Sequence, residues 1–238
     1  MMSITTVLFD LDGTLLPMDQ DLFAKTYFMA IAKDVSPRGY DPKALIDAIW
    51  QSTYAVMKNT GEETNETVFW KHFAAAFGDR VYDDRPTFDR FYEEHFDGIA
   101  SVCGYDERAA RAVKLCHDRG RKTVLATNPI FPGIATLKRM GWAGLKPEDF
   151  VLYTTYENSC YCKPNLKYYE SILAEIGVSP KECLMVGNDV GEDMIAEEMG
   201  MKVFLLTDCI INKKGKDISA YPCGGFDELL QYLDENLN

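Results

Sequence analysis

After Gly104 the sequence alternates between short apolar runs and longer amphipathic segments. Short runs rich in β-branched residues are typical of buried strands, and apolar residues spaced three and four apart predict helices. The predicted strands are residues 122–126, 150–153, 183–186 and 202–206, and the predicted helices are residues 107–119, 133–140, 166–176, 192–199 and 226–237. Such alternation favours an α/β fold with a doubly wound, Rossmann-like parallel sheet.

One further strand is predicted far upstream, at Thr5–Phe9, where an apolar run ends at the polar segment Asp10–Thr14. The residues between this strand and Gly104 contain no second strand pattern. They contain predicted helices at residues 21–33, 42–58, 66–77 and 87–96, with Pro37, Gly61 and Pro86 as breakers. We therefore predict an α/β core domain of residues 1–16 and 99–238, interrupted by a helical cap domain of residues 17–98.

The charge and cysteine content exclude several classes of function. Thirty-seven acidic and 25 basic residues give a net charge of -12, which disfavours nucleic acid as a partner. The seven cysteines form no disulfide framework, and the Cys160–Cys162 pair lacks the second pair of a zinc site. No stretch has the length of a membrane span, and the first residues lack a signal-peptide pattern. We expect a cytoplasmic protein without a membrane partner.

Two carboxylates, Asp10 and Asp12, follow the first predicted strand, where Gly13 permits a tight turn. A carboxylate is ionised at neutral pH and can attack phosphorus directly if a divalent cation screens the repulsion between the two anions. The alternative interpretation is an ordinary Asp–Gly turn capped by Asp10.

Polar residues also follow the later predicted strands, and each set has a simpler alternative. Thr127 and Asn128 can donate hydrogen bonds to phosphate, but Thr-Asn before a proline is also a common loop start. Lys163 can neutralise a phosphate, but it also fits a solvated helix entrance. Asp189 and Asp193 offer the oxygen ligands that Mg²⁺ prefers, or they simply stabilise a helix N-terminus.

Taken together and in this order, the four polar clusters resemble the haloacid dehalogenase superfamily, specifically its phosphatase branch with an α-helical cap. The matching motifs are Asp10-Leu11-Asp12-Gly13-Thr14-Leu15, Thr127-Asn128, Lys163-Pro164-Asn165, and Gly187-Asn188-Asp189 with Asp193. The resemblance covers residues 1–16 and about 100–238. Its first motif is highly specific, whereas the middle two carry little weight alone.

The resemblance implies an aspartyl-phosphate mechanism. Asp10 would be the nucleophile, and Asp12 would protonate the leaving alcohol and then deprotonate the hydrolytic water. Thr127, Asn128 and Lys163 would hold the phosphoryl oxygens. The substrate would be a small phosphorylated metabolite, and the protein would act as a monomer or homodimer.

The resemblance also implies Mg²⁺ as cofactor, bound by Asp10, the backbone carbonyl of Asp12, and Asp189. Asp193 would orient water or Lys163 from behind these ligands. The family usually places an acid directly after the glycine of the fourth motif, where this chain has Asn188. We favour Asp189 over Asn188 as the ligand because a carboxylate binds Mg²⁺ better than an amide does.

The cap would close over the catalytic face and select the substrate. Its possible contacts are Lys25, Tyr27, Lys33, Trp50, Tyr54 and Lys58. Aromatic residues at helical spacing are more often cap core than substrate contacts, so no cap residue is assigned to the site.

Other functions remain open. A phosphosugar mutase of the same superfamily would return the phosphoryl group to its substrate, and a non-catalytic binding or regulatory protein would keep only the scaffold. The carboxylate of Asp12 argues against a dehalogenase, which has no leaving alkoxide to protonate. A phosphonatase would need a reactive cap lysine, and Lys25, Lys33 and Lys58 leave that function open.

Overall fold

The computed structural model describes residues 3–237, and these contain a six-stranded, entirely parallel sheet in the order β3-β2-β1-β4-β5-β6. The strands are β1 (Thr6–Phe9), β2 (Lys122–Leu125), β3 (Leu152–Tyr153), β4 (Cys183–Gly187), β5 (Lys202–Leu206) and β6 (Cys223–Gly224). This order confirms the predicted doubly wound arrangement. The two directions of winding diverge at β1, so the crevice at its carboxyl end is where such sheets bind ligands.

Successive strand residues point to opposite sides of the sheet. Because the central strands are apolar on both sides, both faces of the sheet are apolar and are covered by helices. They are α5 (Glu107–Asp118), α6 (Gly133–Trp142), α7 (Leu166–Ile176) and α8 (Phe226–Asn236). Val7 and Phe9 pack with α5, α6 and α8 in one buried cluster. Leu8 packs with α7 in the other. The central strands are therefore buried on both sides, as their continuous apolar sequences predict.

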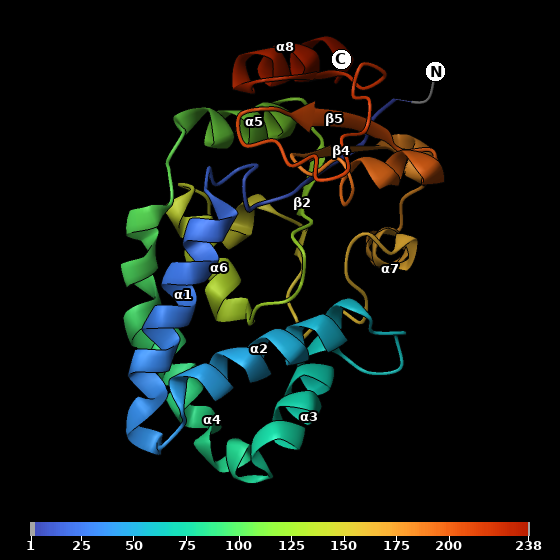
Figure 1. Cartoon of the computed structure of the whole chain (residues 1–238). Helices are drawn as coiled ribbons and strands as arrows, with labels where there is room; N and C mark the ends of the chain where they lie inside the picture. Colours follow the sequence, from blue (N-terminus) through green and yellow to red (C-terminus); the bar gives the residue numbers. More distant parts are fainter. Residues whose placement is uncertain (1–2, 238) are drawn as a thin grey trace.

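Four helices form a separate layer, seen below the sheet in Figure 1. They are α1 (Gln20–Val35), α2 (Pro42–Met57), α3 (Asn65–Phe77) and α4 (Arg80–Arg90). The side chains of Asp19, Asp41 and Thr64 cap α1, α2 and α3 by accepting backbone N–H bonds. An aromatic core that includes Phe73 and Phe88 holds the layer together, with ring centroids 5.4 Å apart.

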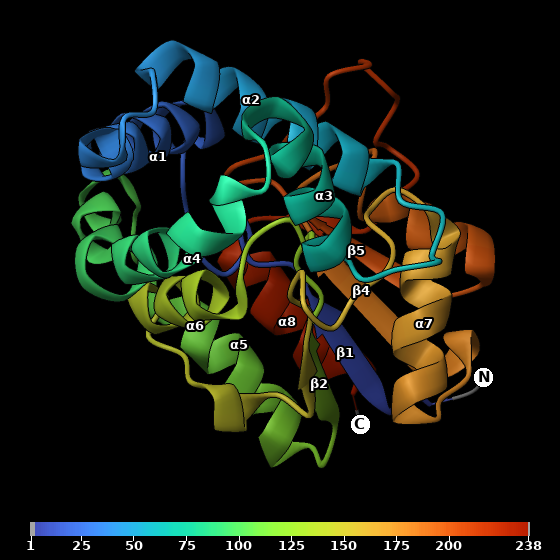
Figure 2. The ribbon, with the colours of Figure 1, turned by 90° about the horizontal axis from the view of Figure 1, so that it is seen from below.

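The two chain segments that join this layer to the sheet lie side by side. Met18 and Cys103 form an antiparallel bridge, and the N–H of Gly104 donates to the carbonyl of Pro17 at 2.7 Å. Figure 2, seen from below, shows α2 and α3 lying across the carboxyl ends of the strands. The helical layer therefore covers the end of the sheet from which the predicted site residues project.

The predicted helix at residues 87–96 is wrong in its boundaries, and Pro86 is not a breaker. Pro86 lies inside α4, which a π-helical turn (Phe91–His95) and a 3₁₀ segment (Phe96–Val102) continue. The buried side chains of Val81 and Phe88 pack into the layer, and this burial outweighs the local cost of the proline.

The predicted helix at residues 192–199 is instead a turn followed by a 3₁₀ segment, Met194–Met199. The strand β6 was not predicted because two residues carry no periodicity. Shorter 3₁₀ turns occur at Ser36–Arg38, Pro147–Asp149 and Pro180–Glu182. Between residues 3 and 237, no helix combines the length and the apolar character needed to cross a membrane.

Candidate active site

The carboxyl ends of β1, β2 and β4 place three of the predicted motifs at one edge of the sheet. Phe9 is in register with Leu125 on one side and Val186 on the other. Asp10 therefore leaves the sheet between the Thr127 loop and the loop after Gly187. Gly13 makes the turn possible: its φ is 87°, and a Cβ there would lie 2.3 Å from the amide nitrogen of Asn188.

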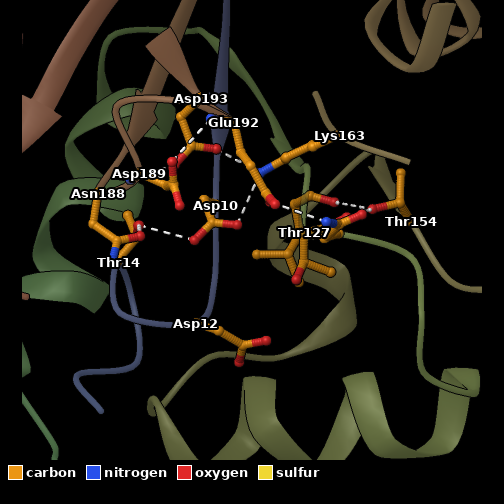
Figure 3. Close-up of polar contacts among 12 residues, drawn as sticks. Asp10, Asp12, Thr14, Thr127, Thr154, Lys163, Asn188, Asp189, Glu192 and Asp193 are labelled. Carbon is orange, nitrogen blue, oxygen red and sulfur yellow. Dashed lines mark hydrogen bonds and ion pairs between the residues drawn. The ribbon is translucent and has the colours of Figure 1, made fainter. Parts of the chain in front are cut away.

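Asp10 and Lys163 form a buried ion pair. The Nζ of Lys163 lies 2.9 Å from Oδ1 of Asp10, and the hydroxyl of Thr14 lies 2.9 Å from Oδ2. The same hydroxyl is 3.0 Å from Oδ1 of Asn188, and since a hydroxyl has one proton it donates to one of the two. Figure 3 shows these side chains converging with Asp189 and Asp193. Both oxygens of Asp10 thus have a donor nearby.

Asp193 is the second carboxylate that binds Lys163. Its Oδ1 lies 2.6 Å from Nζ, and its Oδ2 accepts the backbone N–H of Asp189 at 3.0 Å. Lys163 and Asp193 are each 1% exposed. Burial opposes a charge on Lys163, but the attraction of Asp10 and Asp193 outweighs it and holds the Lys163 pKa well above its ordinary value. The lysine is therefore a cation at neutral pH.

A third element of the site is the loop after β2. The backbone carbonyl of Thr127 accepts hydrogen bonds from the hydroxyls of Thr154 (2.6 Å) and Tyr168 (2.8 Å), which fixes the loop. The side-chain amide of Asn128 donates to Glu192 at 2.9 Å. Burial raises the pKa of Glu192 to about 7. Within residues 3–237, the Oδ1 of Asn128 is buried without a hydrogen-bond donor.

In the loop after β4, Asn188 and Asp189 have different hydrogen-bond partners. The amide of Asn188 donates to the carbonyl of Cys209 at 2.7 Å, and its oxygen faces Thr14, so this side chain links loops. Asp189 uses Oδ1 to accept the backbone N–H groups of Gly191 and Glu192. Its carboxylate lies in the same cluster as Asp10 (Figure 3).

Asp12 lies apart from this cluster (Figure 3). Its Oδ2 forms an ion pair with Nη1 of Arg139, a residue of α6 that is 1% exposed. The guanidinium also lies 4.6 Å from the centroid of Phe131 and donates to the carbonyl of Ala135 at 3.2 Å. Burial raises the pKa of Asp12, and Arg139 opposes that shift.

The sequence reasoning did not identify Arg139. Its position in the helix could have indicated a buried role, because Ala135 and Met140 mark the buried face of α6 and Arg139 lies on that face. An arginine at a core-facing position requires an acidic partner. Nothing in the sequence showed that this partner was Asp12, 127 residues away.

We expect Arg139→Met to destabilise the protein by about 3 kcal/mol, because it leaves the largely buried Asp12 without its counter-charge. The free energy of unfolding can be measured by urea denaturation. The double variant with Asp12→Asn should recover most of the loss, whereas the exposed Arg111 serves as a control position for Arg→Met. Equal stability of Arg139→Met and the native chain would contradict the ion pair.

A cavity of about 310 Å³ opens between the helical layer and this edge of the sheet. Asp10, Asp12, Thr127, Asn128, Asp189 and Asp193 line its floor. The predicted site residues are thus brought together at one cavity, with Lys163 buried directly behind Asp10. Among residues 3–237, no group of three or more His, Cys, Asp or Glu side chains is arranged so that it could hold a metal ion by itself.

The comparisons with known proteins agree with this arrangement. A family model described as haloacid dehalogenase-like hydrolase matches residues 4–200. The pyrophosphatase PpaX of Anoxybacillus flavithermus is 26% identical over 202 residues, which cover 84% of this chain and 82% of the relative.

Two solved structures share the fold. A HAD phosphatase from Thermococcus onnurineus aligns with a TM-score of 0.58 and 19% identity over 98% of both chains. A predicted phosphoglycolate phosphatase from Haemophilus somnus aligns with a TM-score of 0.59 and 16% identity, over 98% of this chain and 99% of that one.

At one edge of the doubly wound sheet an aspartate, a buried lysine and a second acidic loop lie beneath a helical layer, and the family match identifies the chain as a hydrolase. The family match spans well over half of the chain. The chain belongs to the haloacid dehalogenase-like hydrolases.

Proposed function

We propose that this hydrolase is a magnesium-dependent phosphatase that acts on a small phosphorylated metabolite through an aspartyl-phosphate on Asp10. The observation that carries the proposal is the 2.9 Å contact between Asp10 and Lys163 at the floor of the cavity. A carboxylate positioned beside a buried ammonium group faces a phosphorus centre without the full repulsion of two anions.

The proposed reaction uses Asp10 and Asp12 in succession. An oxygen of Asp10 attacks phosphorus, the bond to the leaving oxygen breaks, and Asp12 supplies the proton that the departing alkoxide needs. Asp12 then takes a proton from water as that water attacks the phosphoryl group and releases Asp10. The burial that raises the pKa of Asp12 supports its role as an acid. Lys163 and the Thr127 loop hold the phosphoryl oxygens.

The donor set fits Mg²⁺. This ion prefers oxygen ligands, keeps several waters and needs only one or two carboxylates, so a group of three protein side chains is unnecessary. Asp10, Asp189, Glu192 and Asp193 lie around a single ammonium group, that of Lys163, so a bound cation would stabilise the ionised forms of these carboxylates. Asp10, the carbonyl of Asp12, and Asp189 would hold the ion, which would supply charge neutralisation for an incoming phosphate.

Several other features belong to the same proposal. We assign residues 17–98 to the cap and residues 1–16 and 99–238 to the core, with the cap excluding bulk water from the reaction. All seven cysteines are unpaired thiols, which supports a cytoplasmic protein.

The test is release of inorganic phosphate from a panel of phosphorylated metabolites with Mg²⁺. The panel should include pyrophosphate and phosphoglycolate, because relatives carry those names, and a hexose 1-phosphate for the mutase alternative. We expect phosphate release that excess chelator reduces to background and that added Mg²⁺ restores. Conversion of the hexose 1-phosphate to its 6-phosphate without free phosphate would favour the mutase instead. Turnover that persists in chelator would contradict the metal requirement.

A further inference from the structure

The cap wall of the cavity is rich in aromatic side chains. Its largest side chains are Tyr27, Phe28, Trp50, Phe69, Trp70 and Tyr92. Tyr27 and Trp70 are each 5% exposed, so their rings are fixed by packing. We expected the aromatic cap residues to be explained as cap core, but Tyr27 and Trp50 face the cavity. The part of a substrate that extends away from Asp10 therefore meets ring faces and edges.

The same wall carries no cation. Among the described cap residues that line the cavity, there is no lysine, arginine or histidine, and the charged members are Asp21 and Asp89. Asp89 forms only a distant contact with Arg85, at 4.0 Å. The basic residue in the lining is the exposed Lys213, which comes from the core. A second phosphate or a carboxylate on the substrate would lose its water here and gain no opposite charge.

Two hydroxyl groups of the aromatic wall form a further polar feature. The hydroxyls of Tyr27 and Tyr92 lie 2.7 Å apart and form a hydrogen bond with each other. Burial raises the pKa of Tyr27 to about 12, so the pair is neutral at physiological pH. Such a pair can bind a single neutral polar group but cannot neutralise an anion.

We propose that the substrate is a phosphomonoester whose leaving alcohol carries one uncharged aromatic ring. The inference rests on the proposed phosphatase function and names the substrate class of the same site. A cavity of about 150 Å³ lined by apolar side chains holds one benzene ring. The cavity of about 310 Å³ therefore accommodates a ring together with a phosphoryl group. Substrates with a second anionic group are disfavoured.

The first experiment compares benzyl phosphate with phosphoglycolate and pyrophosphate, each with Mg²⁺. We expect kcat/KM for benzyl phosphate to exceed that for either competitor, each of which carries a second anionic group, by at least about 10-fold, which corresponds to about 1.4 kcal/mol. No phosphate release from any of the three, or from the wider panel, would overturn the proposed function itself. Faster turnover of pyrophosphate or phosphoglycolate would leave that function standing and overturn the substrate class.

The second experiment uses matched pairs of cap variants. Trp50 and Tyr54 lie one turn apart on α2 and are 51% and 54% exposed, but only Trp50 lines the cavity. Trp50→Ala should raise KM for benzyl phosphate about 5-fold by removing a ring contact, and Tyr54→Ala should leave it unchanged. Equal effects of the two variants would overturn the assignment of this wall.

A second pair of variants tests the same wall by adding a positive charge to it. Met57 lines the cavity and Met29 does not, and both are exposed positions on cap helices. Met57→Lys should lower the preference for benzyl phosphate over phosphoglycolate about 5-fold, because it supplies the cation that the wall lacks. Met29→Lys should preserve the native preference. An unchanged preference in Met57→Lys would count against electrostatic exclusion by the wall.

Discussion

Replacing Asp10 with asparagine should lower kcat for phosphate release by about 10³-fold or more, because the substitution removes the nucleophile while keeping the shape of the side chain. The asparagine oxygen can still face Thr14, which lies 2.9 Å from the native carboxylate. The loss should appear in kcat at saturating substrate, since a neutral amide repels phosphate less than a carboxylate does. Initial rates of phosphate release with Mg²⁺ provide the measurement.

A matched substitution separates this effect from a general loss of structure. Asp118→Asn makes the same chemical change in an ion pair on the surface, where Lys114 lies 2.6 Å away, and should retain native activity. The unfolding temperature of Asp10→Asn should show that the variant is folded. Retention of a tenth or more of native kcat in a folded Asp10→Asn variant would show that Asp10 is not the nucleophile.

The sheet and the approach of Asp10 to Lys163 were predictable because both follow from strand order. Apolar runs identify β1, which Asp10 follows, and β3, whose following loop carries Lys163, and the carboxyl ends of parallel strands meet at one edge. Side chains 153 residues apart can therefore be brought together without any knowledge of their packing. The register of β1 with its two neighbours then places the Asp10 and Thr127 motifs within one crevice.

The Arg139–Asp12 pair and the cavity wall were not predictable, because each depends on how helices pack. The pattern of α6 shows that Arg139 faces the core, but the partner is set by the position of α6 against the β1 loop. Tyr27 and Trp50 have the helical spacing of core residues, and only the placement of α1 and α2 over the sheet turns them toward the cavity. The proline in α4 shows the same limit, since packing outweighs local preference there.

Substitution of Lys163 by methionine should destabilise the metal-free protein by about 3–5 kcal/mol. The lysine contacts Asp10 at 2.9 Å and Asp193 at 2.6 Å, and all three side chains are at least nine-tenths buried. Removing the cation leaves two buried carboxylates that repel each other without a counter-charge. Urea denaturation in the presence of a chelator measures the loss, and Lys114→Met on the surface is the control.

The pH dependence of this loss follows from the sign of the carboxylate pKa shifts. Burial already raises the pKa of Asp193 to about 7 in the native protein, and removal of Lys163 takes away the attraction that opposes that shift. A carboxylate whose pKa is higher in the folded than in the unfolded state binds more protons when folded, so stability falls as the pH rises. The deficit of Lys163→Met should therefore be smaller at pH 5 than at pH 8.

Adding Asp193→Asn should recover part of the stability without recovering activity, because the phosphoryl group still lacks its ammonium partner. A deficit that grows toward acidic pH would show that Lys163 does not stabilise these carboxylates by its charge.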